Sequence, residues 1–242
     1  MTVGMVPGAI IAGMVFSLVV SFALPIGLFV YAKKKLGAKT APFFIGCGVF
    51  FVMVLMLEAA IHRIVFQLAG EALTGSVILY AVYGGLMAAL FEETGRYIAM
   101  RFLVKPMDFP NAFMYGAGHG GFEMFVILSM GMVNNLIYAL MINMGQTQTL
   151  LASLDEVSKN TLQTAFDTLI QTPSWQFALS PVERIAAITA QIGLSVIVWF
   201  AAEGEKSRMS LWFLAIALHA LLDGVAVVTS RSGMSLIAVE AL

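Results

Sequence analysis

Residues 8–32 read GAIIAGMVFSLVVSFALPIGLFVYA, an apolar run without a charged side chain, and Lys33, Lys34 and Lys35 follow it directly. About 20 apolar residues suffice for a helix to cross the hydrocarbon core of a bilayer. A continuous run of this length is typical of a helix, whereas barrel strands show short alternating segments. The run therefore predicts a first membrane-spanning helix. It is too long for a signal-peptide core and no Lys or Arg precedes it, so we expect it to be retained.

The composition extends this interpretation to the whole chain. Hydrophobic residues make up 60% of the sequence and charged residues only 11%, whereas a soluble domain is about 25% charged. The bilayer must therefore serve as solvent for much of the surface. The net charge of −1 suggests no nucleic-acid partner, and the single cysteine, Cys47, excludes a disulfide framework or a thiolate metal cluster.

Further apolar runs of spanning length follow the first. The predicted spans are 41–58 with an extension to 68, 74–102, 111–130 with a broken extension to 144, 182–202 and 209–229. A last apolar stub, 234–242, resembles the start of a seventh span. We expect an all-α, polytopic transmembrane helical bundle of about 6–8 membrane helices. These helices should form a single transmembrane domain, 1–242.

The polar stretch 145–181 interrupts this pattern. Apolar residues recur in it at helical spacing, at Leu150, Leu154, Val157, Phe166 and Leu169. The segment from Ser153 to Glu156 fits a capping box. We therefore predict one amphipathic helix lying at the membrane interface. The stretch is either a tethering loop anchored by aromatic residues or a lid that presents substrate.

The distribution of Lys and Arg predicts the orientation, because cytoplasmic loops carry an excess of both. An extracytoplasmic N-terminus leaves four of the thirteen outside: Arg63, Lys159, Arg184 and Arg231. The others fall on the cytoplasmic side: Lys33, Lys34, Lys35, Lys39, Arg96, Arg101, Lys105, Lys206 and Arg208. We expect a multi-pass protein of a bacterial cell membrane, with the stretch 145–181 extracytoplasmic.

Ionisable residues inside the predicted spans indicate a functional site, since each charge at the bilayer centre costs about 2.5–3.5 kcal/mol on insertion scales. The segments FEETGR (91–96), GAGHGGFE (116–123) and LHALLD (218–223) each carry a pair four residues apart, which shares one helix face. All three lie roughly 12–15 Å from the cytoplasmic end of their span. We predict that they converge: Glu92, Glu93 and Arg96, His119 and Glu123, His219 and Asp223.

These residue types suit hydrolysis of a peptide bond, which needs a water, a base and donors for the oxyanion. Glu92 can serve as the base beside Glu93 and Arg96. His119 and His219 can stabilise the oxyanion, with Asp223 holding the tautomer of His219. Glycines at 84–85 and 116–121 can let helices pack closely or a substrate strand approach.

The same residues resemble a known group of proteins. The order Glu92-Glu93-x-x-Arg96, then His119, then His219-x-x-x-Asp223 is similar to the pattern of the CAAX-protease and bacteriocin-processing superfamily and of the related PrsW proteases. The segment GAGHGGFE looks most like the YhfC family of intramembrane proteases within that group. The resemblance implies a glutamate-dependent endopeptidase acting on a membrane-protein or peptide substrate. It leaves open whether His119, after Tyr115, or Glu123, after His119, fills the functional position.

Alternatives stay open at this stage. We expect no cofactor, although His119, Glu123, His219 and Asp223 could supply a zinc set without a His-Glu-x-x-His motif. A non-catalytic scaffold or receptor and a proton-coupled transporter use similar side chains. Glu58 and His62 also share a helix face, and their distance from Ala41 predicts a position near the outer surface, where their role is interfacial or structural. The oligomeric state is not predicted.

Overall fold

The computed structural model describes residues 4–203 and 208–231, and every regular element in these ranges is a helix. Within them, six helical stretches are long and apolar enough to cross a bilayer. They are Gly8–Leu36, Ala41–Thr74, Val77–Phe102, Phe109–Asn143, Ser174–Glu203 and Met209–Arg231. The predicted all-α polytopic architecture is confirmed. The predicted seventh span, 234–242, lies outside the described residues.

Three of the six stretches contain a π-helical segment. The first consists of α1 (Gly8–Tyr31) and η1 (Ala32–Leu36). The second consists of α2 (Ala41–Phe50), η2 (Phe51–Glu58) and α3 (Ala59–Thr74), and the fourth of α5 (Phe109–Met124), η3 (Phe125–Ser129) and α6 (Met130–Asn143). The remaining helices are α4 (Val77–Phe102), α7 (Thr147–Ala152), α8 (Glu156–Gln171), α9 (Ser174–Glu203) and α10 (Met209–Arg231).

The fifth span begins at Ser174 rather than at the predicted Val182, and Pro181 lies inside it. Proline lacks an N–H, so it leaves the carbonyl four residues earlier, that of Phe177, without its helical partner. The hydroxyl of Ser17 in α1 donates a hydrogen bond to that carbonyl. The helix therefore continues through the proline because a neighbouring helix supplies the missing donor.

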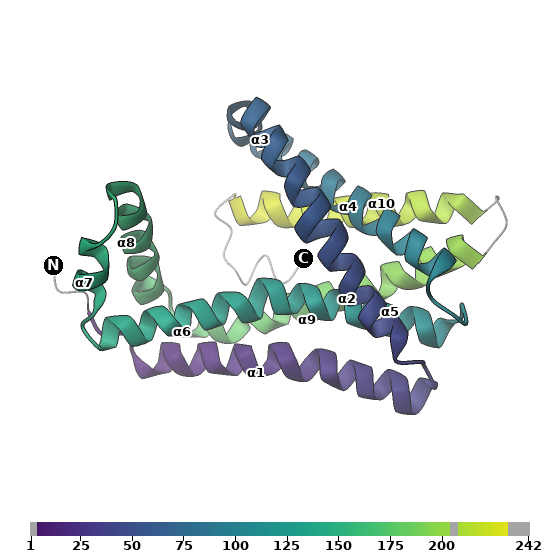
Figure 1. Cartoon of the computed structure of the whole chain (residues 1–242), viewed down its shortest axis with the longest axis horizontal. Coiled ribbons are helices and arrows are strands. Elements are labelled where there is room, and N and C mark those ends of the chain that lie inside the picture. The colour runs from purple at the N-terminus through teal and green to yellow at the C-terminus, as the bar shows by residue number, and fades with distance from the viewer. Residues whose placement is uncertain (1–3, 204–207, 232–242) are drawn as a thin grey trace. The chain divides into compact units, whose positions relative to one another are not determined.

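The helices form two compact units, with boundaries inside α1, at the end of α5 and inside α9. Unit 1 comprises residues 4–24 and 124–184, and its polar stretch folds into α7 and α8 (Figure 1). Its core is apolar and draws on six helices and η3: Val6, Ile10, Met14, Met124, Leu128, Met132, Ala139, Ile142, Leu151, Phe166, Leu169 and Phe177. Val6 lies just before α1.

Helix α8 is capped differently from the prediction. Asp155, not Ser153, is the N-cap, and its carboxylate accepts hydrogen bonds from the backbone N–H groups of Val157 and Ser158, each at 3.0 Å. Ser153 ends α7 instead, and its hydroxyl donates to the Leu150 carbonyl. The hydroxyl of Ser158 and these N–H groups lower the pKa of Asp155. Val157, predicted on the apolar face, is 77% exposed.

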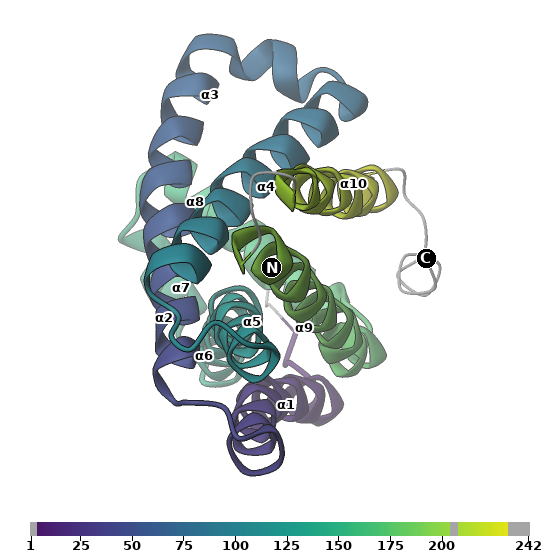
Figure 2. The same cartoon turned by 90° about the vertical axis from the view of Figure 1, so that its right-hand side faces the viewer.

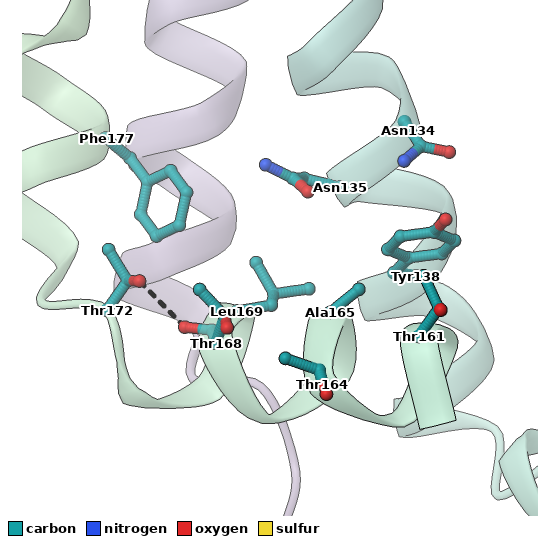
Figure 3. A pocket seen from close by; sticks show the side chains of 10 residues that line it. All are labelled: Asn134, Asn135, Tyr138, Thr161, Thr164, Ala165, Thr168, Leu169, Thr172 and Phe177. Carbon is teal, nitrogen blue, oxygen red and sulfur yellow. Dashed lines mark hydrogen bonds between the residues drawn. The ribbon is translucent and has the colours of Figure 1, made fainter. Parts of the chain in front are cut away.

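A pocket of about 410 Å³ lies between α6 and α8 in unit 1 (Figure 3). Its lining is polar but uncharged, with the amide of Asn135 and the side chain of Leu169 turned toward its middle. The other lining residues are Asn134, Tyr138, Thr161, Thr164, Ala165, Thr168, Thr172 and Phe177. Several of these threonines, such as Thr172, donate their hydroxyl to a backbone carbonyl of α8.

Unit 2 comprises residues 25–123, 185–203 and 208–231. The rod formed by α2, η2 and α3 turns into α4, and α4 packs along α10 (Figure 2). Glycines permit these close approaches: a Cβ at Gly85 would lie 2.5 Å from the Ala220 carbonyl oxygen, and one at Gly118 would meet the Phe43 backbone. The predicted close packing thus holds for both, whereas Gly84 has open space around it.

Candidate active site

Three helices of unit 2 bring buried ionisable side chains to one place. Helix α4 supplies Glu92, Glu93 and Arg96, α5 supplies His119 and α10 supplies His219. Each of these side chains belongs to a residue that is at most 5% exposed. Several unpaired charges at such depth would be costly, so their mutual contacts decide whether the arrangement is stable.

Glu92 is the meeting point of this cluster. Its Oε2 lies 2.8 Å from Nε2 of His119, which donates the hydrogen bond, and 3.9 Å from the Arg96 guanidinium. The ring of Tyr115 stacks on His119, and Phe50 packs edge-on against the same imidazole. The aromatic rings fix the imidazole, and the imidazole in turn fixes the orientation of the Glu92 carboxylate.

The second carboxylate, Glu93, holds His219. Its Oε1 accepts a hydrogen bond of 2.7 Å from Nδ1 of His219 and lies 3.5 Å from Arg96. Nε2 of His219 is 3.5 Å from Asp223 and 4.0 Å from Oε1 of Glu92. The shorter contact of the imidazole is therefore with Glu93, whereas the sequence predicted that Asp223 would hold it.

Gln191 of α9 is a member of the cluster that the sequence analysis missed. Its amide nitrogen donates to Glu92 at 3.0 Å and to Glu123 at 2.8 Å, and its side-chain oxygen accepts from Arg96. Its backbone carbonyl accepts from Arg96 at 3.1 Å and from Ser195 at 2.7 Å. Gln191 and Ser195 are polar residues four positions apart in an apolar span. The same spacing of polar residues had identified the site segments of α4, α5 and α10 in the sequence.

The two candidates for the position on α5 have different neighbours. His119 contacts Glu92 directly and is fully buried. Glu123 is half-buried and accepts a hydrogen bond from the amide of Gln191, which also contacts Glu92. The structure thus places His119 directly against Glu92 and Glu123 one residue further away.

Glu58 lies inside a helical stretch that is longer than the predicted second span. The second span extends to Thr74, so Glu58 lies in its middle and is only 5% exposed. The predicted contact with His62 is present, at 2.9 Å from Nε2 to Oε1. The helical stretch continues beyond Glu58, from η2 into α3, and the interfacial or structural role of the pair stays a prediction.

The cluster in unit 2 suits bond cleavage better than the pocket in unit 1. Among the residues that line the pocket, Tyr138 is the one titratable group. A hydrolytic site needs a base within reach of a water. The cluster offers two carboxylates and two imidazoles at hydrogen-bond distances.

Fold and site together define a class: multi-pass helical membrane proteins with a buried cluster of glutamate, histidine and arginine side chains. The profile of the YhfC intramembrane metalloprotease family matches residues 20–242. A relative from Bacillus subtilis (strain 168), named uncharacterized membrane protein YhfC, is 39% identical over 216 residues, which cover 88% of this chain and 82% of the relative. The chain therefore belongs to the YhfC intramembrane metalloprotease family. No solved structure matches the chain significantly.

The family name implies a metal, so we tested whether the donor atoms fit one. Imidazole and carboxylate are suitable zinc ligands. Within the described ranges, however, no three His, Cys, Asp or Glu side chains are placed to hold an ion. Nε2 of His119 bonds to Glu92, and its Nδ1, which in a metal-bound histidine donates to an orienting group, has no described partner. Arg96, permanently positive, contacts the same carboxylate. This arrangement does not fit a resident metal.

Proposed function

We propose that the chain is an intramembrane endopeptidase of the glutamate type, which hydrolyses a peptide bond of a membrane-associated protein or peptide. The observation that carries this proposal is the separation of 4.0 Å between Oε1 of Glu92 and Nε2 of His219. That separation is too long for a direct hydrogen bond. One water bonded to both atoms spans it, with the base on one side and an imidazole on the other.

In this mechanism Glu92 takes a proton from the bridging water, and the water oxygen attacks the carbonyl carbon of the substrate. His219, held through Nδ1 by Glu93, donates from Nε2 to the oxygen that becomes negative. Glu92 then returns its proton to the leaving nitrogen as the C–N bond breaks. His119, Arg96 and Gln191 keep the Glu92 carboxylate in place throughout. Asp223, 3.5 Å from Nε2, flanks the imidazole.

The proposal extends to the surroundings of the enzyme. Exposed lysines follow α1, and Arg101 and Lys105 follow the reacting segment of α4, which favours a cytoplasmic position for both connections. The N-terminus and the segment 145–181 then lie outside a bacterial cell membrane. The substrate reaches the cluster from the bilayer, where α4 and α10 lie side by side.

The test uses purified protein in liposomes and a panel of single-span peptides that carry a fluorophore and a quencher on opposite sides of the span. Glu92→Gln keeps the shape of the side chain but removes the base, so we expect cleavage to fall at least about 100-fold. Glu71→Gln, an exposed glutamate of α3, is the matched control and should cleave at the wild-type rate.

Equal rates for Glu92→Gln and wild type, with both proteins folded, would refute the assigned base. If the wild-type protein bound peptides of the panel but cleaved none, the result would favour a non-catalytic scaffold. Electrogenic proton movement without cleavage would favour a transporter.

A further inference from the structure

Glu58 is a buried carboxyl group that the proposed reaction does not use. It ends η2 and is 5% exposed, and its Oε2 has no hydrogen-bond partner in the part of the chain that the structure describes. The segment η2, which ends at Glu58, packs against α4, the helix that carries Glu92. A third buried carboxyl group therefore lies on a helix that contacts α4, and one of its oxygens has no partner among the described residues.

The other oxygen of Glu58 begins a chain of hydrogen bonds. Oε1 lies 2.9 Å from Nε2 of His62, and Nδ1 of the same imidazole lies 2.8 Å from the hydroxyl of Tyr83. The ring of Phe66 packs against both His62 and Tyr83 and keeps them in register. Three side chains, from η2, α3 and α4, are therefore aligned through a single imidazole.

The same two hydrogen bonds of this series can form with two different placements of the protons. A neutral imidazole carries one N–H, on either nitrogen. In one arrangement Tyr83 donates to Nδ1 and Nε2 donates to an ionised Glu58. In the other, a protonated Glu58 donates to Nε2 and Nδ1 donates to Tyr83. Passing from the second arrangement to the first, the carboxyl proton moves to Nε2, the Nδ1 proton moves to the Tyr83 oxygen, and the hydroxyl proton of Tyr83 leaves to water.

The series of hydrogen bonds from Glu58 to Tyr83 leads away from the buried cluster. Tyr83 precedes Glu92 by nine residues on α4, which is about 13 Å along the helix, and lies about 9 Å from the start of α4 at Val77. Glu92 is almost fully buried, whereas His62 and Tyr83 are half-buried. The exposed fraction of the side chains thus increases from Glu58 to His62 and Tyr83, toward the end of α4 at Val77.

We propose that Glu58, His62 and Tyr83 form a proton relay between the active-site carboxylates and water at the Val77 end of α4. This inference rests on the proposed function. Hydrolysis gives one hydrogen of the water to the leaving nitrogen and leaves the other on the new carboxylic acid. Glu58 takes that proton, His62 passes it on, and water beyond Tyr83 receives it, so the acyl product becomes a carboxylate. His62 and Tyr83 are positioning residues, because they act on the site through Glu58.

The decisive variant is Tyr83→Phe, which removes one hydroxyl. Its matched control is Tyr80→Phe, one turn earlier on α4, whose ring also packs against Phe66 but takes no part in the hydrogen-bond chain. Arg231 lies over the Tyr80 ring rather than over Tyr83. Both changes remove the same atom from neighbouring positions, so a difference between them reports on the relay and not on packing.

The first readout needs no protease activity. Infrared spectroscopy after a pH jump follows the rate at which the carboxyl group of Glu58 gains or loses its proton, and Glu58→Gln assigns the band. We expect the rate to fall on the order of 10-fold in Tyr83→Phe and to stay unchanged in Tyr80→Phe. In His62→Ala, added imidazole should restore the rate, which a merely structural role would not produce.

The second readout is turnover of the peptide panel. We expect Tyr83→Phe to lower kcat on the order of 10-fold with an unchanged KM, and to alter the dependence of kcat on pH, which the charges of Glu92, His219 and Asp223 also shape. Identical proton-exchange rates and kcat values for Tyr83→Phe and Tyr80→Phe would overturn the relay. The two proposals fail separately, since Glu92→Gln tests cleavage and the infrared rates test proton exchange.

Discussion

At the scale of single residues, Gln191 explains how a guanidinium and two carboxylates coexist in a buried cluster. Its amide donates to Glu92 and Glu123 while its oxygen accepts from Arg96. A side-chain amide has two N–H donors and an acceptor oxygen, whereas a hydroxyl has a single O–H to donate. A hydrophobic residue at this position would leave donors and acceptors of the cluster unpaired, at a cost of about 1–3 kcal/mol for each group.

The same network leads to a prediction about metal removal. Because Nε2 of His119 already bonds to Glu92, and Arg96 contacts that carboxylate, we expect cleavage to persist in 1,10-phenanthroline. Elemental analysis of the purified protein should find less than one zinc for each chain. A zinc peptidase treated in parallel controls for the chelator.

Loss of activity that added zinc restores, together with one zinc for each chain, would contradict this prediction. The result would move the assignment to a metal held by His119, Glu123, His219 and Asp223. It would also mean that these side chains rearrange from the hydrogen-bonded positions described here.

The sequence alone pointed to most residues of the cluster, because a charge inside an apolar span is conspicuous and a second one four residues away defines a face. Glu92, His119 and His219 were found in this way. The sequence could not show which of these side chains contact one another across helices, so the contact of His219 with Glu93 was missed. Gln191 was overlooked because an amide carries no charge.

At the scale of elements, the crossing of α2 and α5 depends on Gly118. A Cβ at this position would collide with backbone atoms of Phe43, which cannot move aside as a flexible side chain would. We expect Gly118→Ala to lower the free energy of unfolding by about 1–3 kcal/mol. Thermal unfolding in detergent measures the effect.

Gly48→Ala on α2 is the matched control, because a Cβ there meets nothing within 4 Å. Alanine is the better helix former by about 1 kcal/mol, so this variant should be as stable as the wild type or more so. A stability of Gly118→Ala equal to that of Gly48→Ala would show that the two helices do not approach as described.

The cap of α8 predicts a dependence of stability on pH. The pKa of Asp155 is lowered in the folded protein, chiefly by the Ser158 hydroxyl. Its stabilisation is therefore present above the unfolded pKa of about 3.9 and is lost as the pH falls through the folded value. The difference in Tm between wild type and Asp155→Ala should shrink as the pH is lowered from 7 to 3.

Ser153→Ala is the control for this measurement. Its hydroxyl bonds to the Leu150 carbonyl at the end of α7, so the variant should show a small change in Tm that does not vary with pH. If Ser153→Ala instead reproduced the effect of Asp155→Ala, the capping box predicted from the sequence would be the better description.

The sequence predicted that each membrane-spanning helix exists, but it did not predict the residues at which these helices begin and end. Apolar runs of spanning length identified all six stretches in the described ranges. Their ends depend on contacts that no single segment reveals, such as the Ser17 hydroxyl that allows α9 to pass through Pro181. The π-helical segment η2 likewise has no local signal among its apolar residues.

At the scale of the whole molecule, the orientation in the membrane decides from which side water and protons reach the site. Helices α1 and η1 end in Lys33, Lys34 and Lys35, all exposed, and the connection from α4 to α5 carries Lys105. The segment around α7 and α8 carries Lys159 together with acidic residues. This asymmetry favours a cytoplasmic position for the former and an extracytoplasmic position for the latter.

Cysteine labelling tests this orientation directly, because Cys47 is the one native cysteine and Cys47→Ser gives a background without thiols. Lys35→Cys and Ser153→Cys place a thiol at exposed positions on the two predicted sides. In intact bacterial cells, a membrane-impermeant maleimide should label Ser153→Cys at once and Lys35→Cys only after the membrane is permeabilised. The reverse order would place the N-terminus inside, and the Val77 end of α4, where the relay leads, would then face the cytoplasm. Protons from the reaction would in that case be released on the cytoplasmic side, so the labelling pattern also fixes the direction of the proposed relay.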